Sequence, residues 1–125
     1  MVIKINIELS GIGTLKGELI RIYAPLSTDA ILSKLPIILR GRFNFGSKAY
    51  WTLPGIEIYK GTNPKSVKNV EKGEIIYSPK TDELLIILEN TEMPNKVNKI
   101  GRVTNNLDVL LNAKNGLNTK ILKAK

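Results

Sequence analysis

The stretch Gly73-Glu-Ile-Ile-Tyr-Ser-Pro-Lys-Thr-Asp-Glu-Leu-Leu-Ile-Ile-Leu88 predicts a β-hairpin around which the rest of the chain is organised. Its first arm, Glu74–Ser78, contains three apolar residues in succession, and its second arm, Leu84–Leu88, contains five. The segment Pro79–Glu83 between them is typical of a turn, because proline fixes φ and aspartate can accept a hydrogen bond from nearby backbone. A strand that is apolar on both faces must be covered on both faces, so Leu84–Leu88 needs cover front and back.

The composition is that of a globular, soluble chain. It has 125 residues, of which 42% are hydrophobic, and this length is enough for one domain with a substantial core. No apolar run approaches the ~18 residues of a membrane span. Residues Ile3–Leu9 alternate between apolar and polar, as a strand does and the apolar block of a signal peptide does not. We therefore expect a single domain over residues 1–125, no membrane segment and a cytoplasmic location.

The residue types that are missing restrict the chemistry. Cysteine and histidine are absent, which argues against a disulfide framework, a structural zinc site or a transition-metal site. A Ser-His-Asp or Cys-His nucleophile system cannot be assembled without them. There is no Gly-x-Gly-x-x-Gly after a predicted strand and no phosphate loop with Gly-Lys-Ser/Thr. We therefore expect no metal, no cofactor and no catalytic residue, and a binding protein is favoured over an enzyme.

Alternating or apolar runs between turn residues predict the remaining elements. Strands are expected, besides the hairpin, at Val2–Leu9, Thr14–Ala24 with a bulge or a bend at Gly17, Ile37–Phe45, Ala49–Leu53, Ile56–Tyr59, Lys99–Val103 and Leu117–Leu122. Helical segments are expected from Ser27-Thr28-Asp29 to Pro36 and after a cap at Asn105 or Asn106, with loops at Lys60–Lys72 and Glu89–Asn98. Short strands with frequent turns and a doubly apolar hairpin favour a mainly β barrel with one or two short helices lying against it.

Five segments of the chain follow one another in a fixed order. They are Leu35-Pro-Ile-Ile-Leu39, Ala49-Tyr-Trp-Thr-Leu-Pro54, Gly73-Glu-Ile-Ile-Tyr-Ser-Pro79, Leu84-Leu-Ile-Ile87 and Lys99-Ile-Gly-Arg-Val103. This order resembles the small cyclophilin-like domains of prokaryotes, a group mostly of unknown function. That group has a Leu-Pro-Leu-Thr-Leu strand after the helix, a Gly-Asp-Ile-x-Tyr-x-x-Pro strand that opens the central hairpin, and a late Leu-Gly-Arg-Ile strand. The resemblance runs from about Ser27 to Leu111 and implies a closed eight-stranded barrel, the cyclophilin fold.

An arginine pair and three aromatic residues are the candidates for a ligand site. The resemblance implies that certain strands of this chain line a barrel groove. The residues that lie in or beside those strands are Arg40, Arg42, Tyr50, Trp51 and Tyr77. Guanidinium groups match carboxylates and phosphates and stack on rings, so this set suits an unidentified small molecule or peptide. The structural alternative is that the aromatics are core residues and the arginines are solvated. The sequence leaves open which arginine faces the groove.

Prolyl isomerase activity is a second alternative function. True cyclophilins isomerise X-Pro bonds with an arginine, a glutamine, a histidine and several aromatic residues in the proline pocket. This chain has no glutamine or histidine, and Glu89–Asn98, where the resemblance would place the pocket tryptophan, has no aromatic residue. Only the arginine can be carried over, as Arg40 or Arg42.

Charge suggests nucleic-acid binding as the first alternative. The net charge is +8. The segment from residue 93 to the end has one acid, Asp108, against the basic residues Lys96, Lys99, Arg102, Lys114, Lys120, Lys123 and Lys125. Such a basic end can contact phosphates, although lysine also protects exposed strand edges and no aromatic residue alternates with these lysines for base stacking. A monomer and a homodimer are both compatible with the sequence.

Overall fold

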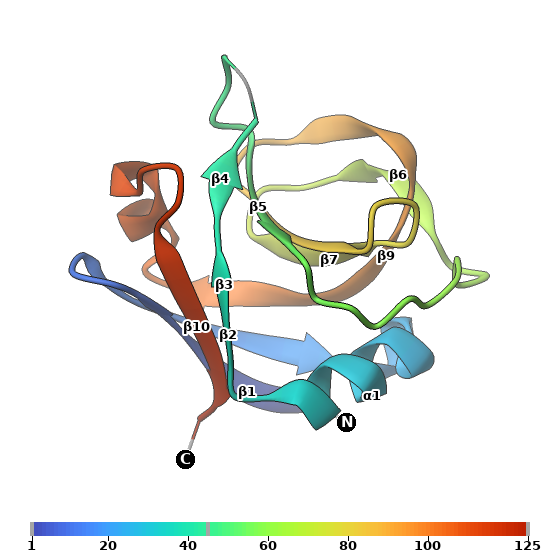
Figure 1. Cartoon of the computed structure of the whole chain (residues 1–125). Helices are drawn as coiled ribbons and strands as arrows, with labels where there is room; N and C mark the ends of the chain where they lie inside the picture. Colours follow the sequence, from blue (N-terminus) through green and yellow to red (C-terminus); the bar gives the residue numbers. More distant parts are fainter. Residues whose placement is uncertain (1, 45, 125) are drawn as a thin grey trace.

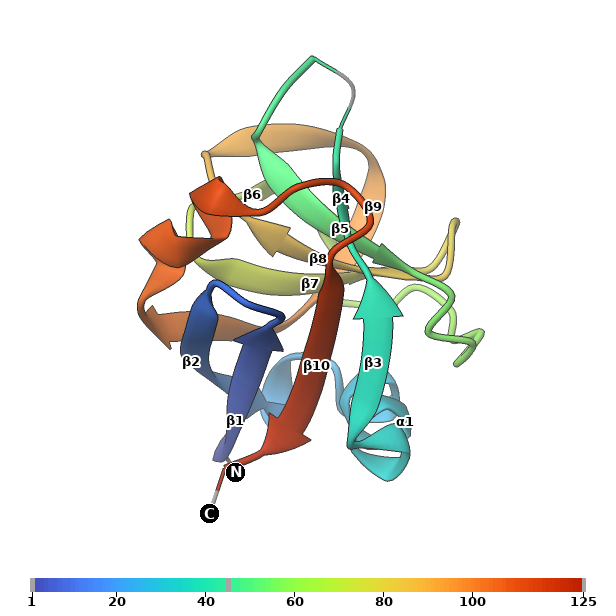
Figure 2. The same cartoon turned by 60° about the vertical axis from the view of Figure 1, so that its left-hand side comes forward.

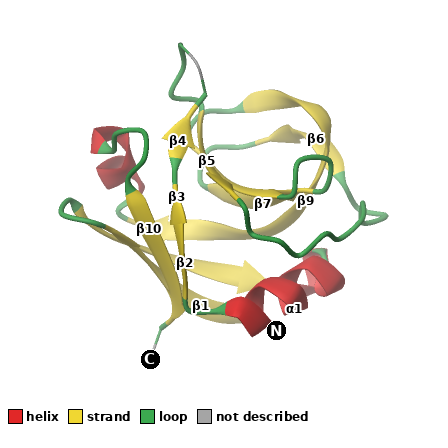
Figure 3. Cartoon of the chain, in the orientation of Figure 1, coloured by secondary structure: helices red, strands yellow, loops and turns green. Residues whose placement is uncertain are grey.

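The computed structural model describes residues 2–44 and 46–124 of the chain. In this part the elements follow one another as β1 (Val2–Leu9), β2 (Gly13–Ile20), η1 (Arg21–Tyr23), α1 (Pro25–Lys34), β3 (Ile37–Arg40), β4 (Arg42–Phe43), β5 (Tyr50–Pro54), β6 (Val67–Val70), β7 (Glu74–Ser78), β8 (Glu83–Ile87), β9 (Thr91–Asn105), η2 (Leu107–Asn112) and β10 (Asn118–Lys123). The strands form one antiparallel sheet in the order β3-β10-β1-β2-β9-β7-β8-β5-β4, and β6 pairs with β9 (Figures 1 and 3). A mainly β architecture is therefore confirmed.

The sheet is an open path and not the closed eight-stranded barrel that we expected. Its two end strands, β3 and β4, are consecutive in the chain, and no pairing between described residues joins them. The predicted strand Ile37–Phe45 is split at Gly41, because β3 pairs with β10 whereas β4 pairs with β5. A Cβ atom at Gly41 would overlap the indole ring of Trp51, so only glycine lets the chain pass here. Phe45 lies outside the described residues.

The central hairpin is confirmed as β7 and β8, and its two faces contact different apolar clusters. The inner residues of these strands and of β5 belong to the main core, in which Trp51, Leu53, Ile75, Tyr77, Leu84, Ile86 and Leu88 are all buried. The outer residues belong to a second cluster among the described residues, formed by Val70, Ile76, Leu85, Ile87, Met93 and Val97 with Tyr50 against it. Side chains of successive strand residues point to opposite faces, so this division follows directly from the pleat.

The cover over the outer face of the hairpin comes from the chain itself. The loop predicted at Glu89–Asn98 is wrong from residue 91 onward: residues 91–98 are the first half of the long strand β9, which curves over the hairpin and pairs with β6 (Figure 1). Pro94 argued against a strand, but it falls in a register shift of the β6–β9 pairing, where an absent N–H costs little. Strand β6 likewise lies inside the predicted loop Lys60–Lys72. Strands β9 and β6 of the same chain therefore supply apolar cover for the outer face of the doubly apolar arm.

Helical segments cover the two ends of the core (Figure 3). At one end α1 buries Ile31, and at the other η2 buries Leu110. Helix α1 begins at Pro25 and not at Ser27, because proline suits the first helical position, and the Ser27 hydroxyl instead accepts a hydrogen bond from Asn98. The predicted strand Thr14–Ala24 ends at Ile20 and gives way to η1, which leads into α1.

Strands β3, β10, β1 and β2 lie side by side in the other half of the sheet (Figure 2). The predicted strands at Val2–Leu9 and Leu117–Leu122 are confirmed within one residue at each end. The bulge expected at Gly17 is present as a register shift against β9, where a Cβ atom would lie 2.8 Å from the Arg102 carbonyl oxygen. A Cβ atom at Gly101 would overlap the Glu18 backbone, so glycines on both strands permit their close approach.

Candidate ligand-binding cleft

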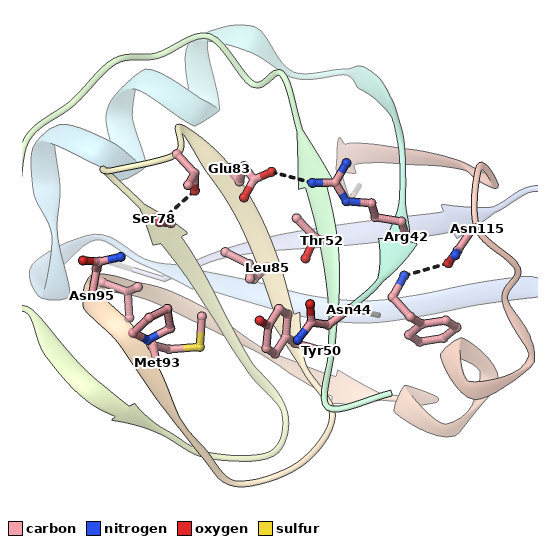
Figure 4. A pocket seen from close by; sticks show the side chains of 14 residues that line it. Arg42, Asn44, Tyr50, Thr52, Ser78, Glu83, Leu85, Met93, Asn95 and Asn115 are labelled. Atoms are coloured by element: carbon pink, nitrogen blue, oxygen red, sulfur yellow. Dashed lines mark hydrogen bonds and ion pairs between the residues drawn. The ribbon is translucent and has the colours of Figure 1, made fainter. Parts of the chain in front are cut away.

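A cleft of about 440 Å³ lies on the outer face of β5, β8 and β7 (Figure 4). Its floor is formed by Thr52, Ser78 and Leu85, which are all buried. One wall is strand β4 with Asn44, and the opposite wall is the start of β9. The other lining residues are Arg42, Phe43, Asn44, Tyr50, Thr81, Glu83, Met93, Pro94, Asn95, Val97 and Asn115.

Strand pairing places the floor residues next to one another. Thr52 of β5 lies opposite Leu85 of β8, and Leu85 lies opposite Ile76 of β7. One step along the same face, Glu83 lies opposite Ser78. The outer face therefore changes from apolar to polar toward the turn of the hairpin, where the cover supplied by β9 stops. A cleft that combines apolar contacts with a few converging polar groups is the usual form of a small-molecule site.

Arg42 and Glu83 are the charged residues that line the cleft in the described part of the chain. Their closest atoms, Arg42 Nη2 and Glu83 Oε2, are 3.4 Å apart, and the side chains are 58% and 16% exposed. This distance is long for a charge-assisted hydrogen bond, which is usually below ~3 Å, so the pair is weak. The Arg42 guanidinium therefore has donors available for a ligand.

Asparagine side chains and a thioether complete the walls. Asn44 and Asn115 lie on the side of the β4–β5 turn, where Asn115 Oδ1 accepts the Phe43 N–H at 2.8 Å. Met93 and Asn95 face them across Leu85 (Figure 4). Amide groups donate and accept hydrogen bonds, so these walls can contact an uncharged polar group of a ligand.

The structure separates the five predicted ligand residues. Arg42 and Tyr50 line the cleft. Arg40 is exposed on β3, where it pairs with Asn118 of β10, and it is not among the lining residues. Trp51 and Tyr77 are both 0% exposed in the main core. The set therefore reduces to Arg42 and Tyr50, and the structural alternative of core aromatics describes Trp51 and Tyr77.

Each buried aromatic residue contacts a specific polar partner. The Trp51 indole N–H donates to Thr119 Oγ1 at 3.2 Å, and its ring meets Phe43 edge-to-face with the centroids 4.8 Å apart. The Tyr77 hydroxyl donates to Asp82 Oδ1 at 2.6 Å. Burial and this hydrogen bond raise the pKa of Tyr77 to about 12. These contacts fix the floor strands from the inside.

Asp82 fixes the loop that we predicted as a strand at Ile56–Tyr59. Its two carboxylate oxygens accept hydrogen bonds from the backbone N–H groups of Glu57, Ile58 and Tyr59, at 2.8, 3.3 and 2.8 Å. Desolvation alone would raise the pKa of Asp82, but the hydrogen bonds from Tyr77 and from these N–H groups together lower it. The loop wraps around a carboxylate, so it cannot pair as a strand, and Glu57 and Tyr59 take positive φ.

Most of the cleft was not predicted from the sequence. Glu83 was assigned to a turn and Thr52 was not among the candidates, although strand alternation could have placed both on the outer face of the hairpin. Met93 and Asn95 were assigned to a loop, and Asn115 comes from a distant turn. Nothing in the sequence near these three residues indicates that they line the same cleft.

The basic residues predicted to contact nucleic acid come from several elements, and two of them form ion pairs with acidic residues. Lys99 pairs with Glu74 at 2.9 Å and Arg102 pairs with Glu18 at 2.7 Å. Lys96 lies on the covering half of β9, Lys114 in the loop before β10, Lys120 opposite Glu8 of β1, and Lys123 at the end of β10. Lys125 lies outside the described residues. Nucleic-acid binding through this set remains an untested prediction.

Two other kinds of site have no counterpart in the described residues. These residues contain no group of three or more acidic side chains that could hold a metal ion, in a chain without histidine or cysteine. Across residues 2–44 and 46–124, no helix has the length and apolar character needed to cross a membrane.

No protein-family model and no curated protein matches the chain. Several solved structures are similar in fold. A hypothetical protein from Archaeoglobus fulgidus is 20% identical with a TM-score of 0.78, over 98% of this chain and 95% of that one. McbB in complex with tryptophan is 14% identical with a TM-score of 0.76; the match covers 94% of this chain but only 44% of McbB. A cyclophilin-type peptidyl-prolyl cis-trans isomerase from Cryptosporidium parvum is 12% identical with a TM-score of 0.65, over 100% and 99% of the two chains. At these identities the likeness is one of fold, and the fold is similar to that of a cyclophilin-type protein.

Proposed function

We propose that the protein is a cyclophilin-like binding module, and that its ligand lies in the cleft with a carboxylate on Arg42. The observation that carries the proposal is a largely exposed guanidinium beside a buried floor of Thr52 and Leu85. A guanidinium forms two parallel hydrogen bonds to a carboxylate, and the floor provides apolar area beside it.

The size and composition of the cleft support a small molecule or a short peptide segment. Its volume of about 440 Å³ is in the range of small-ligand sites. McbB, of which 44% matches this chain in fold, has been solved in complex with tryptophan, so one protein that contains a similar fold binds a small organic molecule. The same geometry also fits an accessory domain that binds the carboxyl terminus of a peptide.

The experiment that tests the proposal compares two arginines. Amide NMR spectra of the ¹⁵N-labelled protein are recorded during titration with a panel of carboxylates and short peptides. Shifts are expected at Arg42, Thr52, Leu85 and Met93. Arg42→Ala should abolish them, and Arg40→Ala, which removes the same charge from the outside of β3, should leave them unchanged. Equal loss in both variants, or no shift at the cleft with any panel member, would refute the proposal.

Isomerase activity is the alternative that the fold neighbour from Cryptosporidium parvum raises. The cleft contains one arginine, but the chain has no glutamine or histidine to complete a cyclophilin pocket. We therefore expect no acceleration of X-Pro isomerisation in a standard peptide assay. If the protein accelerates the isomerisation and Arg42→Ala abolishes the acceleration, the protein is an isomerase and the proposal of a binding module is wrong.

A further inference from the structure

The cleft offers a ligand one positive and one negative group. Among the described residues, Arg42 and Glu83 are the only charged ones that line it, so its charge is balanced. They contact each other only weakly, at 3.4 Å, and Glu83 makes no other ion pair in the described part of the chain. Glu83 is also the more enclosed partner, with 16% of its side chain exposed. A ligand that adds only a carboxylate would leave two carboxylates, its own and that of Glu83, to share the single guanidinium of Arg42.

The balance of charge restricts the class of ligand. This step rests on the proposed function, that a carboxylate binds Arg42. A simple monoanion would place its carboxylate next to that of Glu83, and like charges at short range in a partly desolvated site repel strongly. A ligand that also carries an ammonium group would replace Arg42 as the partner of Glu83. Both protein charges then keep an opposite charge, and the cleft stays neutral.

The short distance between the two protein charges restricts the ligand further. Because Arg42 and Glu83 atoms lie 3.4 Å apart, a ligand can bridge them when its own charges are close together. An α-amino acid carries both on one carbon, whereas the two termini of an extended peptide are too far apart to do so. Away from Arg42 the cleft offers apolar contacts, from Leu85 of the floor and Met93 of the opposite wall (Figure 4).

We propose that the cleft binds an α-amino acid with an apolar side chain. The carboxylate lies on the Arg42 guanidinium, the ammonium group donates to Glu83, and the side chain lies on Leu85 and Met93. Thr52, which lies between the two charged residues on the floor, is within the reach of either backbone group of the ligand.

The test uses three probes that share one ring. L-phenylalanine has both charges, 3-phenylpropionate lacks the ammonium group and phenethylamine lacks the carboxylate. Dissociation constants are measured by calorimetry and by amide shifts at the cleft. Phenylalanine is expected to bind about tenfold or more tightly than either analogue, and glycine, which lacks the apolar side chain, to bind as weakly as they do.

Glu83→Gln gives the second readout. It should reduce phenylalanine binding to the level of 3-phenylpropionate, while 3-phenylpropionate binds as well as before or better, because the repelling carboxylate is gone. Glu8→Gln, which removes a carboxylate from β1 in the other half of the sheet, is the matched control and should change neither. Amide spectra of both variants establish that they are folded.

The outcomes separate this inference from the proposed function. If 3-phenylpropionate binds the cleft as tightly as phenylalanine, the ligand does not need an ammonium group and the amino-acid inference is wrong. The proposed carboxylate site at Arg42 is then still supported. If phenethylamine binds as tightly, the carboxylate site itself is wrong. If phenylalanine does not shift the cleft residues, the amino-acid inference falls, and the Arg42→Ala and Arg40→Ala comparison with the wider panel decides the proposed function.

Discussion

The two faces of the strands β5, β7 and β8 differ in what covers them. The inner face is closed: Trp51, Leu84 and Ile86 lie in a core that the rest of the sheet, α1 and η2 surround. The outer face is covered by β9 and β6 over part of its length and lines the cleft over the rest. Met93 and Val97 of β9 pack on Leu85, and beyond them the face is open and polar. The same three strands therefore provide a core on one side and a binding cleft on the other.

The difference shows how a site can be built without weakening the core beneath it. Residues on opposite faces of one strand alternate, so Thr52 can line a cleft while its neighbours Trp51 and Leu53 stay buried. The position of the site is set by where the cover ends, and the rigid strands below hold its floor. This contrast predicts that a truncation on the inner face costs more stability than the same kind of truncation on the outer face, and that only the outer face affects binding.

The largest effect is expected from truncating the inner face. Ile86→Ala should lower the free energy of unfolding by about 4 kcal/mol, because the cavity it leaves in the main core stays closed. Leu85→Ala, one residue along on the outer face, should cost only about 2 kcal/mol, since water can enter the enlarged cleft. Urea unfolding at neutral pH measures both. Equal costs would mean that the two faces are equally closed.

A smaller loss is expected where the chain crosses the inner face at Gly41. Gly41→Ala places a methyl group against the Trp51 ring and should destabilise the protein by about 2–3 kcal/mol through overpacking. Gly61→Ala is the control, because a Cβ atom there meets nothing within 4 Å, and it should be neutral or slightly stabilising. Thermal unfolding by circular dichroism compares the two. A neutral Gly41→Ala would show that Trp51 can move and that the inner face is not rigid.

The next effect concerns the carboxylate of Asp82, which accepts hydrogen bonds from the loop Glu57–Tyr59. Asp82→Asn weakens the hydrogen bonds to the loop Glu57–Tyr59 and should cost about 2 kcal/mol at neutral pH. The pKa of Asp82 is lowered in the folded state, so its contribution is present above the unfolded-state value of about 3.9 and is lost as pH falls through the folded value. Unfolding measured from pH 7 down to about pH 2 should therefore show the two proteins converging in acid. A difference that stays constant with pH would exclude a role for the Asp82 charge.

The smallest change in stability is expected at the rim of the cleft. Arg42→Ala removes a weak pair at 3.4 Å and should change the free energy of unfolding by less than about 0.5 kcal/mol. Arg40→Ala on the outside of β3 should be equally mild, so that only ligand binding distinguishes the two variants. A loss of more than about 1 kcal/mol for Arg42→Ala would make it a structural residue and weaken the case for a binding role.

Local sequence patterns determined the elements that carry a clear alternation, apolar run or stop signal of their own, even where their partners are far away in the chain. The hairpin arms, the strands at Val2–Leu9 and Leu117–Leu122 and the helix before Pro36 follow from alternation, apolar runs and proline, which act over a few residues. The same patterns required that both faces of Leu84–Leu88 be covered. Composition alone, through the absence of histidine and cysteine, narrowed the chemistry that the chain can perform.

The tertiary structure alone decided what lies over each face. Pro94 made Glu89–Asn98 look like a loop, and only its pairing with β6 reveals the strand that covers Leu85. Neither alternation nor composition indicates that this cover stops before Glu83, or that Arg42 and not Arg40 stands beside the opening. Strand alternation is a local property of the backbone, whereas the depth and lining of a cleft depend on contacts between segments far apart in sequence, which short-range patterns do not encode.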